Sequence, residues 1–110
     1  MQLDLSKFEA MELSTGFIPA DAAGDRRYSV PGSKDLLFVF AYEPGEVGPT
    51  HTHNETHVAL VRSGQVRFTV GEAERVVGAG DMVVMLAGVP HSFEAIGAEA
   101  PTVAELVILP

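Results

Sequence analysis

The stretch His51-Thr52-His53-Asn54-Glu55-Thr56-His57 decides what kind of protein this chain is. It holds three of the four histidines, and the fourth is His91. A single histidine is usually a surface residue or a hydrogen-bonded core residue. Three at this spacing arise by chance in roughly one chain in a hundred or fewer, so the set favours a metal site over separate structural roles.

The spacing of these histidines also indicates the local structure. Residues i and i+2 of a strand point to the same face, so His51 and His53 can present two imidazoles to one ion. His57 then returns from the next strand after a tight turn, and His91 comes from elsewhere in the fold. Ligands from separate strands keep a fixed geometry only on a rigid scaffold, such as a closed barrel.

The chain from Leu36 onward has the pattern of an all-β fold. Short runs rich in β-forming residues alternate with turns that contain glycine, which is typical of a sandwich or barrel. The predicted strands are 36–43, 57–62, 65–70, 74–77, 82–86, 91–96 and 102–109.

Composition sets further limits. The 110 residues suffice for one domain, and the absence of cysteine leaves only nitrogen and oxygen as metal ligands. The formal net charge of −8 argues against nucleic acid and anionic membranes as partners, because both attract basic surfaces. No apolar run is long enough for a signal peptide or a membrane span, which predicts a cytoplasmic protein.

Two motifs resemble those of the cupin family. The first, Gly-x5-His-x-His-x3/4-Glu-x6-Gly, is similar to the run marked by Gly45, His51, His53, His57 and Gly64. The second, Gly-x5-Pro-x-Gly-x2-His-x3-Asn, is similar to the run marked by Gly80, Leu86, Gly88, His91 and Ala95. Both align without a gap, and the short spacer is similar to that of small microbial, RmlC-like cupins.

The resemblance implies a fold and a domain organisation. The fold is a cupin double-stranded β-helix, or jelly-roll barrel, with an N-terminal arm. Residues 36–110 would form the conserved barrel, and residues 1–35 the arm and first strands of the same domain. Such an arm covers the barrel or reaches a partner subunit.

The resemblance also implies one divalent transition metal bound by His51, His53, His57 and His91. Imidazole ligands suit Mn, Fe, Ni and Zn. His57 stands where the family usually has glutamate, so four neutral ligands would leave the charge of the ion uncompensated and favour an anionic ligand or substrate. Glu55 falls in the expected turn, as a surface residue or a hydrogen-bonding partner of a ligand rather than a ligand itself.

Four aromatic residues are candidates for the wall of the ligand pocket. Phe38, Phe40 and Tyr42 alternate along one predicted strand, and Phe93 shares the face of His91. Core packing is the plainer explanation for each one taken alone. Glu105 alternates with apolar neighbours on the last strand, where solvent or an interface is slightly favoured over the barrel interior; it is also the best candidate for a general acid or base.

Two classes of function fit these features. The first is an enzyme that uses the metal as a Lewis acid or O₂ site: a dioxygenase, or an isomerase or epimerase of a small oxo-acid or sugar acid. The second is a non-catalytic barrel that senses or binds a ligand. Exposed strand edges and the apolar residues among the first thirty positions predict a homodimer in either case.

Overall fold

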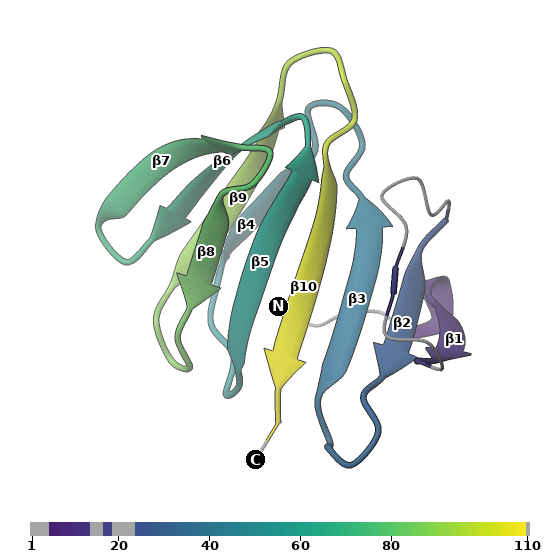
Figure 1. The fold of residues 1–110 in the computed structure, drawn as a ribbon. Helices are drawn as coiled ribbons and strands as arrows, with labels where there is room; N and C mark the ends of the chain where they lie inside the picture. The colour runs from purple at the N-terminus through teal and green to yellow at the C-terminus, as the bar shows by residue number, and fades with distance from the viewer. Residues whose placement is uncertain (1–4, 14–16, 19–23, 110) are drawn as a thin grey trace.

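The computed structural model describes residues 5–13, 17–18 and 24–109. Two β-sheets face one another in this part of the chain, and a single 3₁₀ turn at Leu5–Lys7 precedes them (Figure 1). The six-stranded sheet has the order β1-β2-β3-β10-β5-β8, and the four-stranded sheet has the order β4-β9-β6-β7. The predicted all-β jelly roll is therefore confirmed.

The strands of the six-stranded sheet are antiparallel except for the parallel pair β1 and β2. Its bounds are β1 Glu9–Glu12, β2 Arg26–Ser29, β3 Leu36–Ala41, β10 Thr102–Ile108, β5 Thr56–Ser63 and β8 Met82–Met85. The four-stranded sheet consists of β4 Val47–His51, β9 His91–Ile96, β6 Gln65–Val70 and β7 Ala73–Gly78.

The core lies between the two sheets, because alternate residues of each strand point inward. In β10 the buried residues are Val103, Glu105 and Val107, and in β5 they are His57, Ala59 and Val61. Apolar burial of this kind is the main favourable term in folding. Four buried residues are polar: His57, His91 and Glu105 on strands, and His53 between β4 and β5.

The chain turns sharply between β5 and β6 at Gly64, the last glycine of the first motif. Its φ is +72°, a conformation that L side chains rarely adopt. A Cβ built on Gly64 would also stand 2.7 Å from the Cα of Pro101. Both constraints require glycine here, where the chain passes from β5 in the six-stranded sheet to β6 in the four-stranded sheet.

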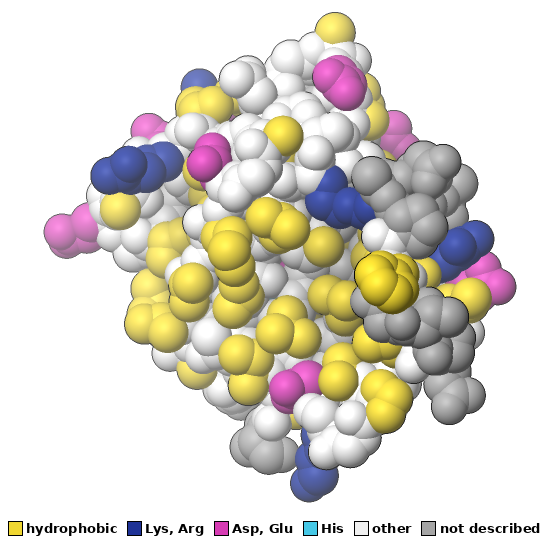
Figure 2. Space-filling view, viewed as in Figure 1, with side chains coloured by type: hydrophobic (Ala, Val, Ile, Leu, Met, Phe, Trp, Pro, Cys, Tyr) yellow, Lys and Arg dark blue, Asp and Glu magenta, His cyan; other side chains and the backbone are white. Residues whose placement is uncertain are grey.

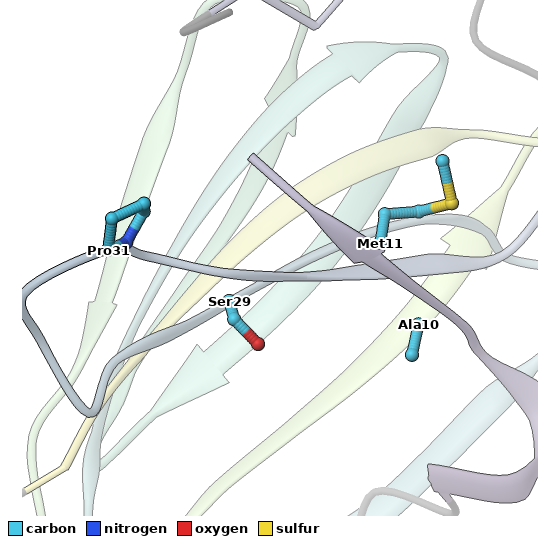
Figure 3. A pocket seen from close by; sticks show the side chains of 4 residues that line it. All are labelled: Ala10, Met11, Ser29 and Pro31. Carbon is cyan, nitrogen blue, oxygen red and sulfur yellow. The ribbon is translucent and has the colours of Figure 1, made fainter. Parts of the chain in front are cut away.

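The N-terminal segment reaches the core through Phe8. Its ring meets Phe38 edge to face at 4.9 Å and Phe40 at 5.9 Å between ring centroids. A hollow of about 460 Å³ lies beside β1 and the end of β2, lined by Ala10, Met11, Ser29 and Pro31 (Figure 3). Of the predicted arm, residues 1–4, 14–16 and 19–23 lie outside the described part of the chain.

Candidate metal centre

The four histidines come from both sheets and from the segment that joins them. His51 ends β4 and is paired with His91, the first residue of β9. His57 is the second residue of β5, in the facing sheet. His53 lies in the crossing between β4 and β5, so the prediction that it shares a strand with His51 is wrong: β4 ends at His51, two residues before His53.

Hydrogen bonds from the second motif hold this crossing in place. The amide of Gly88 donates to the carbonyl of His53 at 2.9 Å, and the amide of Ala87 donates to Oγ1 of Thr56 at 3.2 Å. The loop before His91 therefore positions the segment that carries His53. Two stretches far apart in the sequence form one rigid end of the barrel.

Every imidazole is oriented by a hydrogen bond at Nδ1. A carbonyl or carboxylate oxygen can only accept, so each Nδ1 carries the proton and each Nε2 carries a free lone pair. The pairs are His51 with the Pro49 carbonyl at 2.6 Å, His53 with the Glu55 carbonyl at 2.6 Å, His57 with Glu105 Oε2 at 3.0 Å, and His91 with the Val89 carbonyl at 3.0 Å. All four Nε2 atoms are buried and have no hydrogen-bond partner among the described residues.

The imidazoles form two overlapping groups whose ligand atoms lie within 4.8 Å of one another. One group is His51, His53 and His91, and the other is His53, Glu55 and His57. The rings of His53 and His57 stack with centroids 3.8 Å apart. His91 meets His51 at 4.2 Å and His53 at 4.5 Å, both edge to face. His53 therefore connects the two groups, and each group could hold a metal ion.

Burial keeps two of these rings neutral. Removal from water lowers the pKa of His53, and the nearby His57 lowers it further. Burial is also the main cause that lowers the pKa of His91. Because a metal binds only the unprotonated nitrogen, these shifts prepare both rings to act as ligands at neutral pH.

The preference for a solvent-facing Glu105 is wrong. Glu105 is 1% exposed. Its strand partners, Phe38 on β3 and Ala59 on β5, are fully buried. The sheet register explains the position, because Glu105 shares the inner face of β10 with Val103 and Val107. Its carboxylate accepts a hydrogen bond from Nδ1–H of His57, which supplies the polar partner that a buried acid requires.

Glu55 also faces the histidines. It occupies the predicted bend, its side chain is 30% exposed, and its Oε1 lies 3.7 Å from Nε2 of His57. The carboxylate is therefore close to the lone pairs rather than out on the surface.

The four aromatic residues have two kinds of environment. Phe38, Phe40 and Tyr42 belong to the hydrophobic core, whereas Phe93 is half-buried and packs against it. The rings of Tyr42 and Phe93 stack with centroids 4.2 Å apart. Burial and the negative charge of Glu105 raise the pKa of Tyr42 well above its usual range, so the phenol stays protonated.

A cavity of about 210 Å³ opens between β7 and β8, where the edges of the two sheets separate. No motif in the sequence marks its lining residues as a set, although the alternation of 65–70 places Phe68 and Val70 on one face. Val70 is paired with His91, so the cavity adjoins the histidine end of the barrel. The lining residues are Phe68, Val70, Ala73, Arg75, Val77, Met82, Val83 and Val84.

Comparison with known proteins agrees with this architecture. No curated protein matches the chain, but many solved structures do. A conserved protein of unknown function from Streptococcus pyogenes is 24% identical, with a TM-score of 0.66 over 100% of this chain and 88% of that one. An RmlC-like cupin from Shewanella frigidimarina is 17% identical, with a TM-score of 0.66 over 76% and 72% of the two chains.

The oxalate decarboxylase of Bacillus subtilis, studied for its Mn(II) centres, is 23% identical with a TM-score of 0.64. The match covers 70% of this chain but 22% of that enzyme. Identities this low show a shared fold. The membership itself rests on the family model for the cupin domain, which matches residues 38–109. The chain belongs to the cupin domain family.

Proposed function

We propose that this cupin binds one divalent transition metal through the Nε2 atoms of His51, His53, His57 and His91. One observation carries the proposal: four buried lone pairs at one end of the barrel have no hydrogen-bond partner in the described residues. A buried polar atom without a partner is costly, so four together need an explanation. A shared ion satisfies all four, and the bonds at Nδ1 are those that typically orient metal-bound histidines.

Mn is the first metal to test, with Fe, Ni and Zn as alternatives. Imidazole suits all four ions, and the structurally similar oxalate decarboxylase contains Mn(II). Elemental analysis of protein purified without added metal should find about one ion per chain. His53→Ala should abolish this content because His53 belongs to both groups, whereas the exposed neighbour changed in Thr52→Ala should retain it.

The metal would serve an enzyme that acts on a small, anionic molecule. An octahedral ion with four protein ligands has two positions left for substrate or O₂. Access to the site is supported by the cavity between β7 and β8, because its lining residue Val70 is the strand partner of His91. O₂ consumption distinguishes a dioxygenase from an isomerase or epimerase when the metal-loaded protein is given a panel of small oxo-acids and sugar acids. Metal binding without turnover of any of them would favour a ligand-binding barrel.

A homodimer fits the outer face of the six-stranded sheet. Ala104, Leu60 and Met82 form one apolar row across β10, β5 and β8. Leu106, Val58 and Val84 form the next row. Figure 2 shows the apolar patch on the face of these strands turned toward the viewer. An antiparallel sheet facing water normally carries polar residues on that side, so the rows support a partner surface.

No helix in the described ranges is long and apolar enough to cross a membrane. The cytoplasm stays the location that we propose.

A further inference from the structure

Glu105 is a buried acid in an apolar setting. Its neighbours across the sheet are Phe38 and Ala59, and the hydrogen bond that the structure gives its carboxylate comes from Nδ1 of His57 at 3.0 Å. Both side chains of this pair are 1% exposed. A buried carboxylate is costly unless it is paired with positive charge, and a neutral imidazole offers only one N–H dipole.

A cation bound at Nε2 of His57 would supply the positive charge that balances Glu105. Nε2 of His57 is buried, has no hydrogen-bond partner in the part of the chain that the structure describes, and lies 3.7 Å from Oε1 of Glu55, near the ligand atom of His53. A cation at that nitrogen would stand one imidazole away from Glu105. The carboxylate lies on the Nδ1 side of the ring, remote from Nε2, and this position suits a group that acts through His57 rather than a general acid or base.

We propose that His57 and Glu105 act as one ligand unit, which rests on the metal site proposed above. In the family motif a glutamate at position 57 would bring negative charge directly to the metal. Here that charge lies one residue further out, in Glu105, and polarises the imidazole that replaces the glutamate. Glu105 is thus a positioning residue, and it balances one of the two positive charges that four neutral ligands would leave.

The sheet register allows Glu105 to supply the negative charge that the family motif places at position 57. Val107 is paired with His57, and Glu105 is paired with Ala59. His57 and Glu105 are therefore diagonal neighbours on the inner face of adjacent strands, a separation that long side chains span. A glutamate at position 57 would meet the carboxylate of Glu105 in the same buried space, so the two negative charges would compete.

The test is a double-mutant cycle with Mn(II) as the probe, comparing wild type, Glu105→Gln, His57→Glu and the double variant. The Gln amide keeps an oxygen acceptor for Nδ1–H but loses the charge. In the wild-type background we expect Glu105→Gln to weaken Mn(II) affinity about 10–100-fold. In the His57→Glu background the same change should strengthen binding, because it removes the second of two buried carboxylates.

The control is Glu94→Gln, which removes a half-buried carboxylate paired with Arg67 at 2.6 Å on the other sheet. It should leave Mn(II) affinity unchanged. The electron paramagnetic resonance spectrum of bound Mn(II) should differ between wild type and Glu105→Gln. It should be the same in wild type and in the Glu94→Gln control.

Three outcomes are decisive. If Glu105→Gln matches the control, or if its effect has the same sign and size in both backgrounds, the ligand unit is overturned while the metal site stands. If His57→Glu does not fold, recovery of folding in the double variant supports the unit. If the wild-type protein takes up no Mn(II), Fe(II), Ni(II) or Zn(II), the proposed function itself fails.

Discussion

His57 and Glu105 are joined by a buried hydrogen bond of 3.0 Å between Nδ1 and Oε2, across 48 positions of sequence. Each residue is 1% exposed. The bond links β5 to β10 at the centre of the larger sheet, next to the proposed metal site. The same bond therefore joins two central strands of the barrel and orients one of the proposed metal ligands.

Metal removal should lower the melting temperature. A ligand that binds only the folded state at a hundred times its Kd stabilises that state by about 2.7 kcal/mol. At a pH of about 7.5, where free imidazoles are neutral, chelator should therefore reduce the melting temperature of the metal-loaded protein. His53→Ala provides the control, because a chain that has lost its site should melt at one temperature with or without chelator. Equal melting of wild type in both conditions would contradict the prediction.

Stability of the metal-free protein should fall in mild acid. Burial lowers the pKa of His53 and His91, whereas in the unfolded chain each regains its ordinary value of about 6.5. Below that pH the unfolded chain binds more protons than the folded one, so the free energy of unfolding decreases as pH falls. Above a pH of about 6.5 both histidines are neutral in the folded and the unfolded chain, so their contribution to the free energy of unfolding no longer changes with pH.

Urea denaturation in chelator, between a pH of about 7.5 and 5.5, measures this slope. His53→Asn should reduce it, because one of the two shifted groups is gone. A free energy of unfolding that is constant or rises toward acid across this interval would show that the two histidines are not buried as neutral rings.

Gly48→Ala should destabilise the fold through Phe93. A Cβ at Gly48 would overlap the Phe93 ring, which stacks on Tyr42 at 4.2 Å. Overpacking of this kind costs about 1–3 kcal/mol, which chemical denaturation resolves.

Gly78→Ala is the matched control, because Gly78 lies in a strand and its nearest atom would be 3.7 Å away. Adding Phe93→Leu to Gly48→Ala should recover part of the loss. Equal stability of the two alanine variants would mean that the ring moves aside freely.

Strand positions could be predicted wherever apolar alternation was bounded by glycine. The predicted strands at 65–70 and 91–96 coincide with β6 and β9. No predicted strand range matches β2 or β4, although the histidine spacing did place His51 on a strand. β4 contains Gly48 and Pro49, residues that weaken any strand pattern, and β2 begins with Arg26 and Arg27.

The inward position of Glu105 could not be predicted from the sequence, for a different reason. The alternation with Val103 and Val107 was visible, but a lone carboxylate on a strand usually faces solvent. The inward position depends on His57, and nothing local in the sequence pairs the two. Sheet register decides such a contact, and register is a long-range property of the fold.

The outer face of the six-stranded sheet yields the last prediction. If the apolar rows across β10, β5 and β8 form a homodimer contact, a charge placed there should separate the subunits, since a two-fold contact doubles every substitution. Val84 and Val76 offer a matched pair: both are valines, both are 49% exposed, and they lie on different sheets. Val84→Glu should shift the protein from dimer to monomer in light scattering or sedimentation, and Val76→Glu should not. Because both variants add the same charge to an already acidic chain, general repulsion would affect them equally. A wild-type protein that is monomeric at micromolar concentration, or a Val84→Glu variant that remains dimeric, would rule out this face as the contact.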